Sequence, residues 1–416
     1  MNMYLVVILS ILIVHYGLDL IVEILNVRHV CLDVPQEFRG YYDDEKYRRS
    51  QKYLKDRTVF SLVSSGFFLA VTIAFILTGG FNWIDQWARG FGQGSIVTGL
   101  IFAAALFLGL RILHIPFSLY STFVIEEKYG FNRTTAKTFV TDFIKDILLT
   151  AVFGSAVFIA VVWFFESTGR WGWLYCWGFL VLYELFYYFI YPVAILPLFN
   201  KFIPLEEGEL KTQIEEYARD QRFALAGIFT MDGSRRSAKS NAFFTGFGKF
   251  RRIALFDTLI KQHTTEELVS VLAHEIGHYK KKHILKHIGL SILSMGLMLY
   301  VLSFLINNPG LFSAFAMEQF SVYASLFFFG FLYAPISFVL GIMTMAISRR
   351  HEYQADRFAV MTYKKPQAMI DALKKLTVDN LSNLTPHPAK VFLEYSHPPV
   401  LKRIEAIKNI NIGEIQ

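Results

Sequence analysis

The chain has 416 residues, of which 54% are hydrophobic, 16% aromatic and 18% charged. A water-soluble protein of this length needs more charge to cover its surface, so the composition excludes an ordinary soluble multidomain protein. The formal net charge is +7, and the basic residues are spread over several polar segments. This spread argues against a nucleic-acid partner. We therefore expect an α-helical multi-pass membrane protein.

Seven apolar stretches are each long enough to cross a hydrocarbon core as a helix. They lie at residues 3–25, 59–79, 95–118, 146–165, 171–197, 287–306 and 322–347. The first stretch follows Met1 without a basic segment and without a small-residue cleavage site. It therefore predicts a membrane anchor and not a signal peptide that is removed.

Lysine and arginine are distributed unevenly among the connections. The segments 26–58, 119–145, 198–286 and 348–416 together hold 38, whereas the other connections hold two. Basic residues gather on the cytoplasmic side of membrane proteins. We therefore expect the N-terminus outside, and the C-terminus and the large polar segments in the cytoplasm. Cys31 and Cys176 then lie on opposite sides of the membrane and cannot form a disulfide.

Two cytoplasmic blocks contain the polar secondary structure. In the first block, residues 204–221 predict a helix, and residues 224–234, 240–248 and 251–260 predict short strands. Thr264 precedes Glu267 by three residues, a capping box that opens another helix. The second block, 348–416, is predicted to be mostly helical. Because the helices at 287–306 and 322–347 form a hairpin, the two blocks can meet.

The helix after Thr264 carries the sequence "VLAHEIGHYKKKH". His274 and His278 are four residues apart, so their rings project from one helix face and can both reach a tetrahedral zinc ion at roughly 2.0–2.1 Å. Glu275 lies on the flank, where a zinc protease has its general base. A chance occurrence is the alternative, but the clear helix cap and the apolar neighbours favour a buried metal site.

A third ligand is available in "SRRHEYQADRFAV", directly after the last apolar stretch. Glu352 and Asp356 share a helix face. We expect Glu352 to complete the zinc ligands and Asp356 to accept a hydrogen bond from a ligand histidine, which fixes its tautomer. His351 is a competing ligand, but its position points it away from that face. The alternative is an amphipathic helix with ordinary charges.

Several motifs together resemble the type I CaaX prenyl protease family, which are multi-pass membrane zinc metalloproteases of the gluzincin type. The motifs are "HEIGH", "HEYQAD", "SNAFFTGFGKFRRIALFDTL", "SHPP", "YDDEKYRRSQKYLKDR" and "EEKYGFNRTT". The resemblance implies one Zn²⁺ per chain, held by His274, His278 and Glu352, with Glu275 activating water. It implies a discontinuous cytoplasmic-side α+β metalloprotease domain. Its halves are 198–286 and 348–416, and residues 1–197 and 287–347 form the membrane part.

The resemblance also implies residues that contact a substrate. Asn241 and Ala242 match an edge strand to which a peptide adds as a further strand. His397 and Arg403, in the pattern "HPPxxxR", match residues beside the oxyanion and the substrate, although His397 before two prolines is also explained as a turn residue. The implied partner is a peptide or protein with a prenylated C-terminal CaaX segment, approached from membrane lipid.

Ionisable residues also occur inside the apolar stretches. His15, Asp19 and Glu23 recur every four residues, and Arg111 and His114 lie in the third stretch. Such groups usually face a bundle interior or a water-filled cavity. One interpretation is an ion pair between Asp19 and Arg111. The other, implied by the resemblance, is a water-filled chamber that Glu184 also faces.

Two other functions are compatible with parts of the sequence. One is a quality-control membrane metalloprotease of the HtpX type, although seven spans are more than such chains usually have. The other is a transporter or channel with an incidental HExxH, which needs internal repeats that the sequence lacks. The length and the lack of a terminal endoplasmic-reticulum retrieval signal predict a bacterial inner-membrane protein, or an endoplasmic-reticulum protein if the source is eukaryotic.

Overall fold

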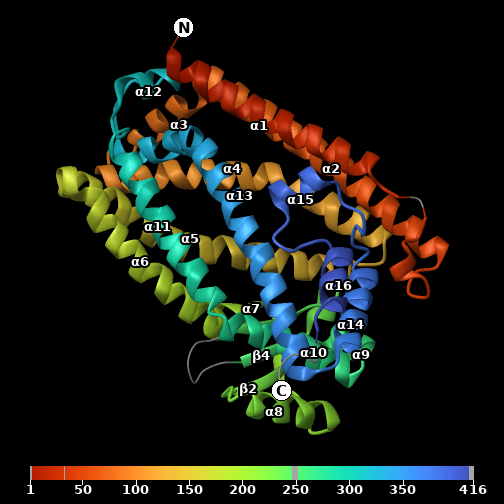
Figure 1. Ribbon diagram of the computed structural model, residues 1–416. Helices are drawn as coiled ribbons and strands as arrows, with labels where there is room; N and C mark the ends of the chain where they lie inside the picture. The colour runs from red at the N-terminus through yellow and green to blue at the C-terminus, as the bar shows by residue number, and fades with distance from the viewer. Residues whose placement is uncertain (1, 32, 246–251, 412–416) are drawn as a thin grey trace.

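The computed structural model describes residues 2–31, 33–245 and 252–411 and consists mainly of long helices (Figure 1). Within these residues, seven helical segments are long and apolar enough to cross a membrane. They contain α1 (Met3–Arg28), α2 (Asp44–Leu77), α4 (Ser95–Tyr120), α5 (Ala136–Ser167), α6 (Gly172–Ile190), α11 (His283–Ser303) and α13 (Val322–Tyr363). Each coincides with one span predicted from hydropathy.

Two of these helices extend well beyond their apolar part. Helix α2 begins at Asp44, where the side chain of Asp43 accepts a hydrogen bond from a backbone N–H of the first turn. Helix α13 runs unbroken for 42 residues, from Val322 to Tyr363. The segment with the expected third ligand, directly after the last apolar stretch, is therefore a continuation of the same helix. No glycine or proline interrupts residues 342–363, so nothing ends the helix where the apolar run ends.

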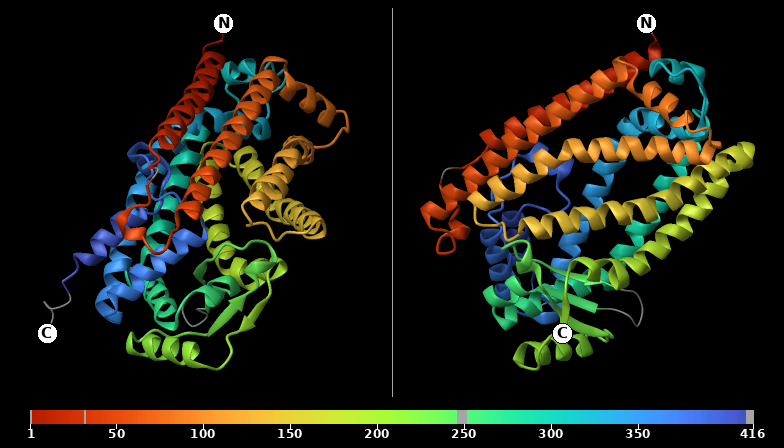
Figure 2. Two further views of the ribbon diagram at one scale, coloured as in Figure 1. Left: turned by 90° about the vertical axis from the view of Figure 1, so that its right-hand side faces the viewer. Right: turned by 180° about the vertical axis from the view of Figure 1, so that it is seen from behind.

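Shorter helical pieces connect the long ones. Two π-helical segments, Ser121–Glu126 and Tyr191–Ile195, extend α4 and α6 toward the polar end of the molecule. The short helices are α3 (Gly80–Arg89), α7 (Leu196–Phe199) and α12 (Pro309–Ala314), with 3-10 turns at Gln36–Phe38, Gly169–Trp171 and Gly233–Arg235. Helices α3 and α12 lie near the N-terminus, and the sheet and α8 lie at the opposite end (Figures 1 and 2).

A small mixed sheet has the strand order β1-β2-β4-β3. Its strands are β1 (Phe202–Pro204), β2 (Gly227–Met231), β3 (Ala242–Thr245) and β4 (Arg252–Phe256). Strand β2 pairs parallel with β4, and β3 pairs antiparallel with β4 so that Ala242 faces Leu255. Strands β2, β3 and β4 each lie within one of the three predicted segments, but the last prediction extends too far, because residues 257–260 belong to helix α9 (Asp257–Gln262). Strand β1 is an additional one. Among the described residues, β3 has only one partner strand and forms an edge.

The two polar blocks pack against each other through α10 (Thr265–Lys280) and α13. One hydrophobic core contains Leu272 and Ile276 of α10, Leu255 of β4 and Ala359 of α13. The remaining helices are α8 (Glu209–Asp220), α9 (Asp257–Gln262), α14 (Pro366–Asp379), α15 (Pro388–Glu394) and α16 (Val400–Lys408). This packing places the HExxH helix α10 directly beside the C-terminal part of α13. The exact domain boundaries stay a prediction.

The ionisable residues of the third span have a different partner from the one expected. Arg111 forms an ion pair with Asp146 of α5, and Asp19 lies 3.8 Å from His15 on its own helix. The interpretation of an Asp19–Arg111 pair is therefore wrong. Helix α4 packs beside α5, so the carboxylate that pairs with Arg111 comes from α5. The expected depth of a residue in the membrane does not show which helix is its neighbour.

The other ionisable residues of the spans also have definite surroundings. Glu23 lies 2.8 Å from Lys390 of α15, so the end of the first span is tied to the second polar block. His114 stacks on Phe68 with ring centroids 3.8 Å apart. One carboxylate oxygen of Glu184 is buried without a hydrogen-bond partner among the described residues. A water-filled chamber stays a prediction.

Candidate metal centre

Helix α10 places both histidines of the HExxH on one face. Its capping box is present as predicted: Thr264 Oγ1 accepts from the Glu267 N–H, and the Glu267 carboxylate accepts from the Thr264 N–H. These two contacts satisfy amides that the helix leaves without partners at its start. His274 is buried, and the His278 side chain is 21% exposed. The histidine pair therefore faces a protein interior that has access to solvent at one edge.

A close approach of α10 to α13 brings the third acidic residue to this face. A Cβ at Gly277 would lie 3.2 Å from the backbone of Ala355 and 3.1 Å from the ring of Phe358. Both distances are shorter than nearly all contacts of real Cβ atoms. Only glycine at position 277 allows this contact without displacement of α13, and Glu352 lies one turn before Ala355.

The ligand atoms of His274, His278 and Glu352 converge within 4.8 Å of one another. The two Nε2 atoms are 3.0 Å apart. Glu352 places Oε2 at 3.4 Å from His274 Nε2 and Oε1 at 3.2 Å from His278 Nε2. A tetrahedral ion with bonds of roughly 2.0–2.1 Å separates its ligand atoms by about 3.3 Å. Oε2 of Glu352 is buried and has no hydrogen bond among the described residues, although Arg403 Nη1 lies 3.3 Å away. The three side chains therefore fit a metal ion between them.

Two further side chains, Asp356 and Arg403, contact this group of three candidate ligands. Asp356 Oδ1 lies 2.8 Å from His274 Nδ1, as predicted. Arg403 of α16 donates two hydrogen bonds to Asp356, of 2.8 and 2.6 Å, and its Nη1 lies 3.3 Å from Glu352. The paired carboxylates raise the pKa of Arg403 although its burial opposes this. Arg403 is buried, so the structure places it against the ligand residues and not at an open surface.

His278 has an outer partner that the sequence analysis missed. His283 Nδ1 lies 3.1 Å from His278 Nδ1, and His283 Nε2 lies 2.9 Å from the side-chain oxygen of Gln354. If His278 keeps Nε2 free for a metal, its proton is on Nδ1 and is donated to His283. The His283 proton is then on Nε2 and is donated to Gln354. A single choice of tautomers for His278 and His283 satisfies both hydrogen bonds, and these bonds fix the orientation of the His278 ring.

His351 does not take part in the metal group. Its ring stacks on His283 with centroids 3.9 Å apart, and its Nδ1 lies 3.2 Å from His287 Nε2. The prediction that His351 points away from the face of Glu352 and Asp356 is therefore confirmed.

The electrostatics of α10 suit proton transfer. Burial raises the pKa of Glu275, and the neighbouring histidines only partly offset this. A carboxylate with a raised pKa is a stronger base. Burial lowers the pKa of His274, but the hydrogen bonds with Asp356 and Glu352 outweigh it and raise this pKa to about 9. A metal ion at this position would compete with a proton for the ring of His274.

His397 lies on the open side of the group. Its side chain is 62% exposed, and its Nε2 is 3.4 Å from Glu352 Oε1. Its Nδ1 contacts Ser396 Oγ at 2.8 Å. The ring is therefore held beside the metal ligands and presents an exposed edge. The prediction that it meets the substrate is compatible with this position.

Asn241 lies one residue before the edge strand and not inside it. It is exposed, and its side-chain oxygen accepts a hydrogen bond of 2.8 Å from the N–H of Ala242. Its backbone oxygen accepts from Phe256 at 3.1 Å, so pairing with β4 includes Asn241. Residues 246–251, which the sequence analysis included in this region, lie outside the described residues.

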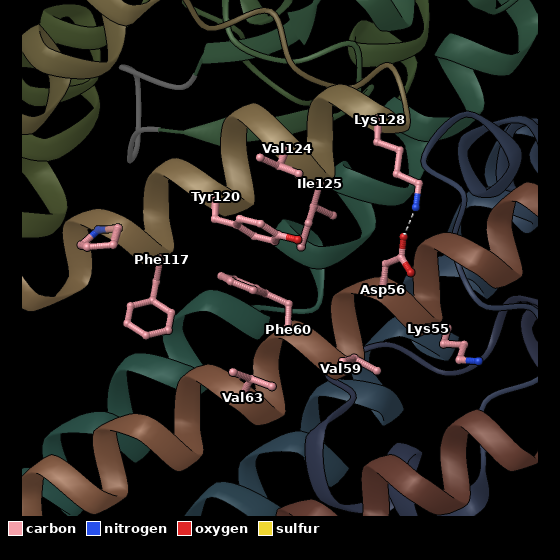
Figure 3. Close-up of a pocket in the computed structure, with 11 residues that line it drawn as sticks. Lys55, Asp56, Val59, Phe60, Val63, Phe117, Tyr120, Val124, Ile125 and Lys128 are labelled. Atoms are coloured by element: carbon pink, nitrogen blue, oxygen red, sulfur yellow. Dashed lines mark hydrogen bonds and ion pairs between the residues drawn. The ribbon is translucent and has the colours of Figure 1, made fainter.

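Helix α2 separates two cavities. One face lines a groove against α4 with Lys55, Val59 and Phe60, at whose end Asp56 pairs with Lys128 at 2.6 Å (Figure 3). The opposite face, which includes Arg57, lines a cavity of about 760 Å³ that also contains His397 and Arg403. The second cavity therefore borders the metal centre at His397 and Arg403.

Comparisons with known proteins agree with this geometry. Residues 23–201 match the model "CAAX prenyl protease N-terminal, five membrane helices", and residues 204–411 match the model "Peptidase family M48". A CAAX prenyl protease 1 homolog of Oryza sativa is 35% identical, over 98% of this chain and 97% of that protein. A probable CAAX prenyl protease 1 of Schizosaccharomyces pombe is 36% identical, over 94% of this chain and 86% of that protein.

The same fold occurs in a solved structure. The crystal structure of S. mikatae Ste24p has a TM-score of 0.92 and 31% sequence identity, and the match covers 97% of this chain and 99% of that one. Neither an HtpX-type protease nor a transporter is needed to explain the chain. It therefore belongs to peptidase family M48, as a multi-pass membrane metalloendopeptidase related to the CAAX prenyl proteases.

Proposed function

We propose that the metal is a single zinc ion and that His274, His278 and Glu352 bind it. Two imidazole nitrogens and one carboxylate oxygen, spaced 3.0–3.4 Å apart, carry this proposal. This ligand set is typical of catalytic zinc, which keeps a further position open. Asp356 and His283 orient the two histidines, and Arg403 holds Asp356 and Glu352 in place.

A zinc ion at this site supplies a Lewis acid that polarises a peptide carbonyl and makes water more acidic. Glu275 takes the proton from the attacking water, since burial raises its pKa, and returns it to the leaving amine. His397 has its exposed ring edge beside Glu352. From there it donates a hydrogen bond to the oxygen of the carbonyl as negative charge develops.

The substrate peptide adds as a strand to the free edge of β3, beginning at Asn241 and Ala242. The antiparallel pairing of β3 with β4 leaves its other edge open among the described residues. An added strand binds through main-chain hydrogen bonds and accepts varied side chains. Asn241, exposed at the start of this edge, provides an amide for the substrate backbone.

The substrate is a protein with a prenylated C-terminal CaaX segment. Support comes from the relatives, which are named CAAX prenyl proteases. The test is cleavage of a farnesylated CaaX peptide by the purified protein together with measurement of its metal content. Glu275→Gln is expected to retain about one zinc per chain and to lose activity, whereas His274→Ala loses both. Near-normal turnover by Glu275→Gln would contradict the assigned base.

The active site faces the cytoplasm, as the distribution of basic residues predicts. Which membrane holds the protein stays a prediction. The match covers 97% of the rice relative, so length does not separate this chain from a eukaryotic protein. Of the two observations that predicted a bacterial inner membrane, chain length therefore no longer supports it, and the lack of a terminal retrieval signal remains.

A further inference from the structure

The cavity beside the metal centre has walls from four parts of the chain. It is lined by α1, α2, α14 and the segment between Asn380 and Arg403, and its volume is about 760 Å³. It contains His397 and Arg403, which lie 3.4 and 3.3 Å from Glu352, so it borders the metal ligands. A cleaving enzyme must accommodate the part of the substrate that lies after the cleaved bond, and this cavity has room for several residues.

The direction of the edge strand places the C-terminal side of a substrate in this cavity. A peptide that adds antiparallel to β3 has its C-terminal residues toward Asn241, the start of the strand. Beyond Asn241, Ser240 exchanges hydrogen bonds of 3.1 and 3.2 Å with Asn380, and Asn380 lines the cavity. A peptide leaving β3 at this end therefore enters the cavity.

Of the lysines and arginines that line the cavity, Arg57 is the one available for an anion. Lys390 pairs with Glu23 and Glu394, and Arg403 pairs with Asp356 and Glu352. Arg57 is exposed, and no carboxylate of the described residues lies within ion-pair distance of it.

Arg57 is also held in position. Its Nη1 donates a hydrogen bond of 3.5 Å to the Tyr53 hydroxyl, and its guanidinium lies 5.5 Å from the centroid of the Tyr53 ring. The Tyr53 hydroxyl in turn donates to Glu126 at 2.5 Å. Among the described residues the other guanidinium N–H groups have no hydrogen-bond acceptor, and two of them match the two oxygens of a carboxylate.

We propose that Arg57 binds the free C-terminal carboxylate of the substrate, in the cavity between α2 and α14. This inference rests on the proposed function, because it deepens the description of its substrate. Binding of this carboxylate favours bonds a short distance from a chain end. An internal peptide bond has no carboxylate at that distance.

The test compares two farnesylated CaaX peptides that differ only in a C-terminal carboxylate or amide. The wild-type protein should prefer the carboxylate roughly 10- to 100-fold in kcat/KM, the scale of a charged hydrogen bond. Arg57→Gln should lose this preference by slowing cleavage of the carboxylate peptide alone, and Arg57→Lys should keep part of it. Lys55→Gln is the matched control: it removes the same charge on the same helix, but Lys55 faces the groove of Figure 3.

An equal loss on both peptides, or a preference that persists in Arg57→Gln, would overturn the carboxylate site. Binding of the two peptides to Glu275→Gln, measured by calorimetry, separates this proposal from the proposed function. If the wild type cleaves neither peptide but Glu275→Gln binds the carboxylate more tightly through Arg57, the proposed function fails and the carboxylate site stands. If cleavage occurs without a role for Arg57, only the carboxylate site fails. If neither is seen, both are overturned.

Discussion

Replacing His283 by Phe should weaken metal binding without unfolding the chain. In the tautomer that leaves His278 Nε2 free for a metal, His283 Nδ1 accepts a hydrogen bond of 3.1 Å from His278 Nδ1–H and donates one of 2.9 Å from its Nε2–H to Gln354. Without this acceptor the Nδ1–H of His278 has no protein partner, which costs about 1–3 kcal/mol in a buried site. Because the His278 side chain is 21% exposed, water replaces part of the contact. We therefore expect the zinc dissociation constant to rise about tenfold.

The assay is titration of the metal-free protein with zinc in competition with a chelator. His287→Phe is the matched control, because His287 lies one turn further along α11 and contacts His351, not a metal ligand. His283→Asn retains an acceptor and should recover part of the affinity. The melting temperature of each metal-free variant shows whether the fold is retained. An unchanged dissociation constant for His283→Phe, or an equal change for His287→Phe, would refute the reasoning.

Three further results are expected. Asn241→Ala should lower kcat/KM by an amount equivalent to about 1 kcal/mol, a small hydrogen-bond contribution because the residue is exposed, and should leave the melting temperature unchanged. An unchanged kcat/KM with a lowered melting temperature would remove Asn241 from the site. Gly277→Leu should push α10 away from α13, which lowers both the free energy of unfolding, by at least about 1–3 kcal/mol, and the metal affinity. Gly289→Leu should change neither quantity, because nothing lies within 4 Å of a Cβ added at Gly289. An impermeant thiol reagent should label Cys31 only in opened cells and a cysteine introduced at 307–321 in intact ones; the opposite labelling would invert the topology.

The candidate metal ligands could be predicted because helical periodicity fixes their geometry. His274 and His278 lie one turn apart in any α-helix, and Glu352 is recognised because Asp356 shares its face. Burial of the neighbouring apolar residues excluded a solvated surface. The same reasoning identified Asp356 as the partner of His274, at 2.8 Å.

The rest depends on contacts that no local pattern encodes. His283 is five residues after His278, a spacing that does not share a helix face, and it reaches back because Lys282 has a φ of +57° and breaks the helix. The partner of Arg111 depends on which helix packs beside α4. Strand β1 has only three residues and ends in a proline, so its sequence carries almost no strand signal.

Hydropathy also cannot predict where a helix ends, because it measures the preference of side chains for an apolar environment and not the conformation of the backbone. The apolar run of α13 ends near residue 347, but the helix continues to Tyr363. Glu352 is therefore about 8 Å along the helix axis from the end of the apolar run, at 1.5 Å per residue. An extended peptide covers roughly 3.3 Å per residue. A bond two or three residues from a lipid anchor can thus reach the metal centre while the anchor stays in the bilayer. This continuous helix is therefore compatible with the proposed substrates, in which the cleaved bond lies close to a lipidated residue.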